Sequence, residues 1–260
     1  MVALSPRQHE IVAIARSTGR VDVDALAARF DITPQTIRKD LNDLARLGLV
    51  QRFHGGALVS SGVANLTYDS RRQLATGAKQ AIGAAAARLI PNDCSLFINI
   101  GTTTEQVASA LVGHQGLMVI TNNLNVAHIL RGHTHIEVVV AGGVVRHSDG
   151  GIVGEAAVEF IRQFKVDYAV IGASAIDGDG ALLDFDYREV SVAKAIMAGS
   201  RHAMLVADSM KLSRSAPVRI GRLADLDTFV TDAPLPPALA QICQDADVDI
   251  VLATEAGPQS

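Results

Sequence analysis

The chain has 260 residues, which is enough for two ordinary domains. Hydrophobic residues make up 48% of it and aromatic residues only 4%, so the core must be built from aliphatic side chains, which suits buried parallel strands. The net charge of −4 argues against a uniformly basic nucleic-acid binder. The charge is uneven, however: residues 1–56 hold 8 Lys or Arg and 6 Asp or Glu, whereas residues 57–260 hold 15 and 21. A basic head on an acidic body is expected when only the head contacts nucleic-acid phosphate.

The sequence predicts no metal site, cofactor or membrane segment. Cys94 and Cys243 lack the spacing of metal ligands, and we expect both to be buried thiols. The first ten residues, MVALSPRQHE, have no apolar signal-peptide core, and no apolar run is long enough for a membrane span. We therefore expect a cytoplasmic protein with no membrane partner.

The first thirty residues predict two helices. Ser5-Pro6-Arg7-Gln8 has the form of a capping box with Pro at the first helical position, and Gly19 is a plausible stop. Asp22 is a candidate N-cap for a second helix, whose apolar residues are Leu26, Ala27 and Phe30.

A third helix is predicted to begin at Thr33, with Pro34 in its first turn and Gly48 at its end. Its core-facing residues are Ile37, Leu41 and Leu44. Its outward polar residues are Gln35, Thr36, Arg38, Lys39, Asn42 and Arg46. The second helix of a helix-turn-helix enters the major groove, where Gln and Arg can read base edges, and Lys and Thr suit phosphate.

A basic hairpin is predicted after this helix. Residues 49–53 alternate like a strand, His54-Gly55-Gly56 makes a turn, and residues 57–59 return. The alternative is a structural three-helix module with a solvated charged face, but the helix order, the caps and the hairpin favour double-stranded operator DNA as the partner. The expected DNA-binding residues are Thr33, Gln35, Thr36, Arg38, Lys39, Asn42, Arg52 and His54.

We expect a DNA-binding domain over residues 1–59, a polar linker over 60–76, an α/β domain over 77–254 and a tail over 255–260. Arg71, Arg72 and Lys79 near the linker could form salt bridges or simply be solvated. In the α/β domain, nearly all-apolar strands alternate with helices, which predicts a mainly parallel sheet. The expected strands are 95–100, 117–121, 136–141, 166–172, 202–207, 227–231 and 249–252, and the expected helices are 77–90, 104–111, 123–130, 154–163, 187–198 and 237–243.

Polar residues follow five of the predicted strands, where ligands of parallel sheets bind. Gly101-Thr102-Thr103-Thr104 opens a helix after the first strand, and its hydroxyls and N–H groups could hold an anion, although it could also be only a capped helix start. The other strand-end residues are Asn122, Asn123, Gly142, Arg146, Gly172 to Ser174, Asp177 to Gly180, and Asp208 to Lys211. Together they predict a polar pocket for an anionic ligand.

Several long motifs resemble the DeoR family of repressors over nearly the whole chain. They are TPQTIRKDLNDLARLGLVQRFHGGA in the head, and IGTTTEQVA, VITNNLNVA, AGGVVR, DGGIVGEA, DGDGALLDFDYREV and DSMKLSR in the body. The resemblance implies a winged helix-turn-helix and a sensor domain similar in fold to ribose 5-phosphate isomerase. It also implies a phosphate held by Gly101 to Thr104, in a pocket otherwise lined by Asn123, Arg146, Asp184 and Lys211.

The family resemblance implies a repressor that a phosphorylated metabolite releases from its operator, and that associates as a dimer or tetramer. LLDFDYREV and DGGIVGEA point to sn-glycerol 3-phosphate, whereas pocket chemistry alone does not select glycerol over a pentose. One departure is Ala193-Lys194, where many members carry Lys-Arg, so Arg188 and Lys194 are candidates to compensate.

Two other functions were weighed. The carboxylates of a sugar-phosphate isomerase could come from Asp177, Asp179, Asp184, Asp186 or Glu189, but such enzymes usually have no DNA-binding head. A nucleotide-binding module is disfavoured because no Gly-x-Gly-x-x-Gly follows the first strand of the body. We therefore expect a regulator with no catalytic residues.

Overall fold

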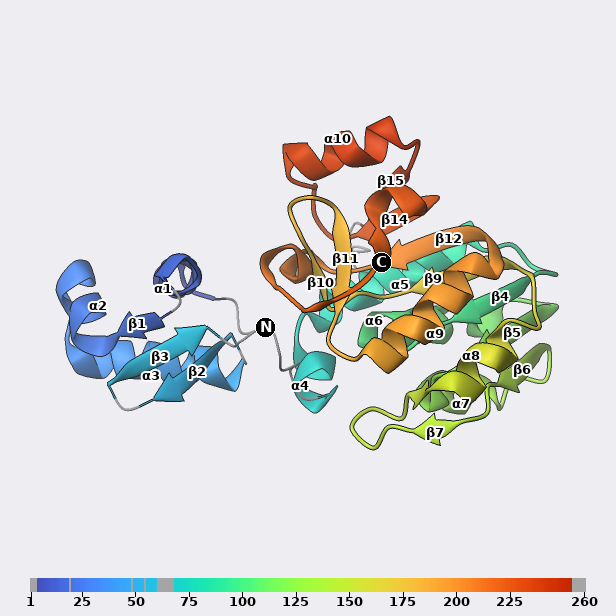
Figure 1. Ribbon diagram of the computed structural model, residues 1–260, viewed down its shortest axis with the longest axis horizontal. Coiled ribbons are helices and arrows are strands. Elements are labelled where there is room, and N and C mark those ends of the chain that lie inside the picture. The colour runs from blue at the N-terminus through green and yellow to red at the C-terminus, as the bar shows by residue number, and fades with distance from the viewer. Residues whose placement is uncertain (1–3, 19, 48, 54, 60–67, 254–260) are drawn as a thin grey trace, which may run out of the picture. The chain divides into compact units, whose positions relative to one another are not determined.

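The computed structural model describes residues 4–18, 20–47, 49–53, 55–59 and 68–253 (Figure 1). The chain divides into two compact units, Met1–Leu74 and Ala75–Ser260. His54, the start of the expected linker and the expected tail lie outside the described residues.

The first unit is a winged helix-turn-helix, as predicted. Its elements are α1 (Pro6–Thr18), β1 (Arg20–Asp22), α2 (Val23–Phe30), α3 (Pro34–Arg46), β2 (Val50–Phe53) and β3 (Gly56–Val59). The strands form one antiparallel sheet in the order β1-β3-β2, in which β1 is a short strand that the sequence pattern did not reveal.

The predicted caps begin the helices of this unit. Gln8 donates its backbone N–H to Ser5 Oγ, and Ser5 N donates to Gln8 Oε1, which completes the capping box. Asp22 accepts from Asp24 N and Ala25 N at the start of α2, and Thr33 Oγ1 accepts from Thr36 N at the start of α3. The predicted stops Gly19 and Gly48 lie outside the described residues.

A short helix, α4 (Tyr68–Gln73), lies within the segment that the sequence suggested was an irregular linker. Its pattern was missed because it has no apolar stripe. The guanidinium groups of Arg71 and Arg72 instead lie 5.8 and 5.7 Å from the centre of the Tyr68 ring, one helical turn back.

The second unit is an α/β domain around a seven-stranded sheet whose neighbouring strands are all parallel, as predicted. The strand order is β15-β14-β12-β9-β4-β5-β6. These strands are β4 (Ser95–Ile98), β5 (Leu117–Thr121), β6 (Ile136–Val140), β9 (Val166–Ile171), β12 (Ser200–Val206), β14 (Thr228–Thr231) and β15 (Asp249–Leu252). The helices are α5 (Thr76–Leu89), α6 (Thr102–Ala110), α7 (Leu124–Leu130), α8 (Glu155–Ile161), α9 (Tyr187–Ala198) and α10 (Pro237–Asp245), with short 3-10 turns η1 (Leu111–Gly113), η2 (Ser209–Ser213) and η3 (Leu223–Asp225).

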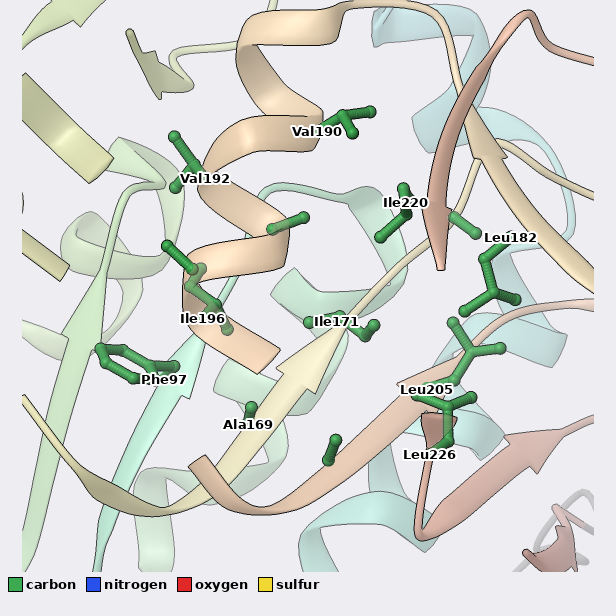
Figure 2. Close-up of a cluster of buried hydrophobic side chains, with 14 of the residues drawn as sticks. Phe97, Ala169, Ile171, Leu182, Val190, Val192, Ile196, Leu205, Ile220 and Leu226 are labelled. Carbon is green, nitrogen blue, oxygen red and sulfur yellow. The ribbon is translucent and has the colours of Figure 1, made fainter. Parts of the chain in front are cut away.

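Helices cover both faces of this sheet (Figure 1). One core contains α5, α6 and α7, and the other contains α8, α9 and α10. Figure 2 shows Ile196 of α9 packed in the second core with Phe97 of β4 and with Ala169 and Ile171 of β9. Because each strand is apolar on both faces, it reads in the sequence as a continuous apolar run.

Five short strands of the α/β domain were not predicted. β7 (Val144–Val145) and β8 (Ile152–Val153) form a hairpin, and β10 (Ala175–Ile176), β11 (Ala181–Asp184) and β13 (Val218–Arg222) form a small antiparallel sheet. They lie in segments that contain Gly and Asp, which are typical of loops, so the sequence pattern does not reveal such short strands. The prediction of a buried thiol is confirmed for Cys243, whereas Cys94 is half-buried and donates to Pro91 O.

The strand order places a topological switch point between β4 and β9. After β4, the chain adds β5 and β6 on one side of the sheet. After β9, it adds β12, β14 and β15 on the other side. Open parallel sheets bind ligands at the carboxyl ends of the two strands that flank such a point. Residues 99–104 and 172–174 follow these two strands.

Candidate nucleic-acid interface and ligand site

Helix α3 presents the predicted polar face to solvent. Ile37, Leu41 and Leu44 are fully buried in the core of the first unit. The side chains on the opposite face are exposed, except that Thr36 is half-buried; they are Gln35, Thr36, Arg38, Lys39 and Asn42. The exposed N-cap Thr33 completes the set. This face can enter a major groove without disturbing the core.

Two contacts hold other elements of this unit against α3. Arg52 of β2 donates from Nη1 to Arg38 O at 3.3 Å, which places the basic residue of the hairpin beside the recognition helix. The buried Asp40 of α3 accepts from Arg7 Nε at 2.6 Å and from Gln8 Nε2 at 3.3 Å. The hydrogen bond to Asp40 also raises the pKa of Arg7. Both contacts fix α3 by side chains from elsewhere in the unit.

The predicted ligand residues of the second unit follow the carboxyl ends of different strands. Gly101 to Thr104 follow β4, Asn123 follows β5, and Gly142 and Arg146 follow β6. Asp184 ends β11, which comes after β9, and Lys211 lies in η2, which comes after β12. Gly142 is exposed beyond the edge strand, Lys211 is half-buried, and Asp184 is buried and accepts from Phe185 N.

Of these positions, the start of α6 has the most specialised local geometry. Gly101 has φ of 154°, and a Cβ there would lie 3.2 Å from Thr104 Oγ1, so glycine suits this position. Thr104 is fully buried and donates to Asn99 O and Gly101 O, which makes it structural. Thr102 and Thr103 are buried residues whose hydroxyls have no hydrogen bond within the described residues, and both residues lie in the first turn of the helix, beside its N–H groups. The hydroxyls of Thr102 and Thr103, unlike that of Thr104, are therefore not committed to a contact within the described residues.

Asn123 connects the ends of β4 and β5. It caps α7 by accepting from Asn125 N and donates to Glu105 Oε1 of α6 at 3.3 Å. Asn125 donates to the same carboxylate oxygen at 3.1 Å. Both polar atoms of the buried Asn123 amide therefore already have partners, and these contacts connect α6 to α7.

Arg146 lies at the centre of a cluster of carboxylates. Its Nε and Nη2 contact both oxygens of Asp149, Nη1 lies 3.2 Å from Asp186, and Nη2 lies 2.6 Å from Glu189. Burial and the nearby Asp184 raise the pKa of Glu189 to about 8, although Arg146 works in the opposite direction. The hydrogen bonds from Arg188 lower the pKa of Asp186 to about 2. All three guanidinium nitrogens of Arg146 therefore already contact carboxylates.

The Ala193-Lys194 pair lies away from this edge of the sheet. Ala193 is buried in the core under α9, and the exposed Lys194 lines a cavity of about 660 Å³ between α8 and α9. Phe164, Lys165 and Gly199 also line it, and they precede β9 and β12 at the amino edge of the sheet. Lys194 thus belongs to a different place from the predicted ligand site, whereas Arg188 pairs with Asp186 beside it.

Sequence reasoning missed four residues that shape the carboxyl edge: Asn99, Glu105, Asp149 and Glu189, the last of which entered only as an isomerase candidate. The signal for Asn99 was present, because it interrupts the apolar run of SLFINIG. Glu105 carried no such signal, since its partners Asn123 and Asn125 are distant in sequence. Asp149 pairs with Arg146 three positions earlier, but such a spacing of opposite charges is common and does not single it out. Among the described residues, no group of His, Cys, Asp and Glu is arranged to hold a metal ion, and no helix is long and apolar enough to cross a bilayer.

A winged helix-turn-helix joined to an open, parallel α/β domain is the architecture of a DNA-binding regulator that carries a sensor domain. Residues 7–62 match the DeoR-like helix-turn-helix domain, and residues 75–233 match the DeoR C terminal sensor domain. The chain belongs to the DeoR family, and it is a transcriptional repressor.

Similar curated proteins span nearly the whole chain. The glycerol-3-phosphate regulon repressor of Haemophilus influenzae is 49% identical over 88% of this chain and 90% of its own length. The protein of the same name from Escherichia coli is 43% identical over 95% and 98%. The HTH-type transcriptional repressor CsqR of Escherichia coli is 41% identical over 96% of each chain.

Solved structures give a weaker likeness. Ribose 5-phosphate isomerase A from Neisseria gonorrhoeae is 15% identical, with a TM-score of 0.38, over 51% of this chain and 52% of its own. The beta subunit of eIF2B from Chaetomium thermophilum is 15% identical, with a TM-score of 0.46, over 69% and 57%.

Proposed function

We propose that this repressor binds its operator through α3 and the β2–β3 hairpin, and that sn-glycerol 3-phosphate releases it. The start of α6 carries the proposal of a phosphate ligand. There the glycine turn, the hydroxyls of two buried threonine residues and the N–H groups of the first turn lie together at the switch point of the sheet. A phosphate dianion is the ligand that suits such a site.

The choice of glycerol rests on the relatives. Two similar proteins are named for a glycerol-3-phosphate regulon, and they align with almost all of this chain. A third, at 41% identity, carries a different name, so the ligand must be tested against other esters. In the proposed complex, Thr102 and Thr103 hold the phosphate, Lys211 adds positive charge, and Arg146 keeps the β7–β8 hairpin in place through its carboxylates.

The proposed role is regulatory and not catalytic. Asp184 and Glu189 lie beside one another at the carboxyl edge, as the effect of Asp184 on the pKa of Glu189 indicates, but Glu189 contacts Arg146. The carboxyl group of Glu189 is thus engaged in a contact within the domain. Purified protein is expected to show no interconversion of aldose and ketose phosphates in a coupled assay.

We also propose self-association, as a dimer or tetramer, so that two heads can bind paired half-sites of an operator in the cytoplasm. Paired heads read half-sites one helical turn apart, and a ligand that alters their spacing lowers affinity for DNA. Sedimentation of the free protein and of its DNA complex would establish the number of chains.

The ligand is tested by titrating sn-glycerol 3-phosphate, fructose 6-phosphate and ribose 5-phosphate against the protein bound to a duplex that it has selected from a random pool. We expect glycerol 3-phosphate to release the DNA at millimolar concentration or below and to raise the melting temperature of the free protein. Linkage requires DNA to weaken ligand binding by the same factor. Release by another ester alone would reject glycerol 3-phosphate but keep the sensor.

A variant pair locates the site. Thr103→Val combined with Lys211→Ala should abolish release while operator binding persists, because neither residue lies in the head. Ser109→Ala is the matched control: Ser109 is on the same helix, but its hydroxyl donates to Glu105 O within the helix. If both variants respond like the unaltered protein, the start of α6 is not the phosphate site.

A further inference from the structure

Two buried amide oxygens at the switch point have no hydrogen-bond partner among the described residues. They are Oδ1 of Asn99, a residue 1% exposed, and Oδ1 of Asn122, a residue 0% exposed. Buried polar atoms are nearly always paired, because an unpaired one keeps the full cost of losing water. A pair of such atoms in one place calls for an explanation.

The two side chains lie next to each other at the carboxyl ends of neighbouring strands. Ile98 of β4 is in register with Thr121 of β5, so Asn99 and Asn122 occupy the next paired position. Neighbouring strands are about 5 Å apart, and paired residues of parallel strands point to the same face. That face is the one covered by α8 and α9, because Phe97 and Ile120, two residues earlier in each strand, pack in that core.

Asn99 also lies directly at the switch point. Its backbone N–H donates to Val170 O of β9, and Gly101 at the start of α6 is two residues further along the chain. The two oxygens are therefore adjacent to the turn that we assign to the phosphate. A ligand held there by its phosphate would extend its carbon chain across the ends of β4, β5 and β9.

The orientation of the Asn122 amide is set by its other end. Its Nδ2 donates to Ile152 O at 3.0 Å, and Ile152 N donates back to Asn122 O at 2.7 Å. The amide nitrogen is thereby committed to the strand β8, which leaves the oxygen as the end available to a ligand.

We propose that Asn99 and Asn122 form a hydroxyl-recognition subsite, in which their Oδ1 atoms accept hydrogen bonds from the hydroxyl groups of a phosphorylated polyol. This inference rests on the proposed function and adds what the site selects. Two acceptors require donors, so hydroxyl groups fit. Carboxylate and ketone oxygens only accept hydrogen bonds at neutral pH. Against the two amide oxygens they would lose their hydrogen bonds to water and gain none in exchange.

The ligand arm of the test compares molecules of similar size. Calorimetric titration of the full chain with sn-glycerol 3-phosphate and 3-phosphoglycerate should show at least about a hundred-fold preference for the former, since the latter replaces a hydroxymethyl group by a carboxylate. Dihydroxyacetone phosphate, with a ketone at the middle carbon, should also bind more weakly. Inorganic phosphate measures the phosphate site alone.

The protein arm uses Asn99→Leu, which removes the unpaired oxygen and keeps the same branched heavy-atom skeleton. This variant should bind sn-glycerol 3-phosphate at least about ten-fold more weakly and lose its preference over 3-phosphoglycerate, while its affinity for inorganic phosphate is unchanged. Its melting temperature without ligand should be equal to or above that of the unaltered protein, because a buried unpaired group has been removed. Asn122→Leu should lose affinity in the same way, but without the gain in stability, since it also loses the bond to Ile152.

Thr231→Val is the matched control. Thr231 Oγ1 is likewise buried and without a partner, but it ends β14, which β12 and β9 separate from β4. This change should also keep or raise the melting temperature, with no effect on ligand affinity. Unchanged selectivity in Asn99→Leu, or a loss of stability without a loss of affinity, would overturn the subsite and leave the proposed effector standing. If none of the polyol phosphates binds the unaltered protein, both proposals fail together.

Discussion

Nη2 of Arg146 lies 2.6 Å from Oε2 of Glu189, and this contact joins the β7–β8 hairpin to the first turn of α9. The same guanidinium contacts Asp149 and Asp186, so one cation serves three carboxylates. It cannot neutralise all of them, and burial together with the nearby Asp184 raises the pKa of Glu189 to about 8. The contact thus sets both the position of the hairpin and the charge of the edge beside the proposed ligand site.

Removal of Arg146 is expected to destabilise the α/β domain strongly. Arg146→Met would leave buried carboxylates without a cation, which typically costs about 3–5 kcal/mol. Arg188→Met is the control, because Arg188 is exposed and pairs with Asp186 from the surface, where ion pairs contribute little. Urea denaturation at pH 7 measures both variants, and equal midpoints would show that Arg146 has no structural role.

The raised pKa of Glu189 predicts a loss of stability as the pH rises. Glu189 ionises near its ordinary value of 4.5 in the unfolded chain but holds its proton to about 8 in the native state. Between these values the native state binds more protons at Glu189, so the contribution of this residue to stability is greatest below about 4.5 and falls as the pH approaches 8. Glu189→Gln has no proton to lose. Its melting temperature should therefore rise relative to that of the unaltered protein as the pH is raised from 5 to 8.

The control for this pH dependence is Glu159→Gln, because Glu159 is exposed and pairs with Arg162 at the surface. Its melting temperatures should follow those of the unaltered protein at every pH. Parallel curves for Glu189→Gln as well would show that Glu189 is ionised in the native state.

Local signals explain why the helices and long strands could be predicted from the sequence. Ser5, Asp22 and Thr33 make their cap bonds with residues two or three positions along the chain. The strands of the large sheet are apolar on both faces and need no knowledge of their neighbours to be recognised. By contrast, strands such as β8 and β10 are two residues long, and they exist because of partners elsewhere in the fold.

The sequence predicted that the proposed ligand site lies at the carboxyl edge of the sheet, but it did not predict the contacts among the residues there. Gly101 and the threonines after it stand out because a polar run follows an apolar strand. The pairing of Arg146 with Glu189 spans 43 positions of the chain, and nothing local marks it. The sequence also cannot distinguish Thr104, which bonds to Asn99 O, from Thr103, whose hydroxyl lacks a partner within the described residues.

Within the head, two aspartates of α3 are expected to differ in their effect on stability. Asp40 is buried and bonded to Arg7 and Gln8, so Asp40→Asn should cost about 1.5–3 kcal/mol. Asp43→Asn loses a pair with the exposed Arg46 and should cost less than about 1 kcal/mol. Urea denaturation followed by circular dichroism of the head transition measures both, and a larger effect at Asp43 would contradict the proposed α1–α3 connection.

The last prediction separates base reading from phosphate contact in the head. Arg38 is exposed on the outward face of α3, where a bidentate contact to guanine contributes about 1–3 kcal/mol of discrimination. Arg38→Ala should therefore weaken binding to the selected duplex and leave binding to a scrambled duplex almost unchanged. Arg52 lies at the hairpin, and its charge is expected to meet a phosphate. Arg52→Ala should weaken both duplexes similarly and reduce the slope of log affinity against log salt by about 0.9.

Arg52 also donates to Arg38 O, so its alanine variant changes a contact within the protein as well as a charge. Arg52→Lys separates these effects, because it keeps the charge: the salt slope should return to that of the unaltered protein even if some affinity is lost. Arg29→Ala removes an arginine of α2 that pairs with Glu10, and it should leave affinity and slope unchanged. Fluorescence anisotropy on both duplexes, from 50 to 200 mM salt, measures all four variants. Equal losses on the two duplexes for Arg38→Ala would assign Arg38 to the phosphate backbone, and full affinity in both Arg38→Ala and Arg52→Ala would place the DNA on another face of the head.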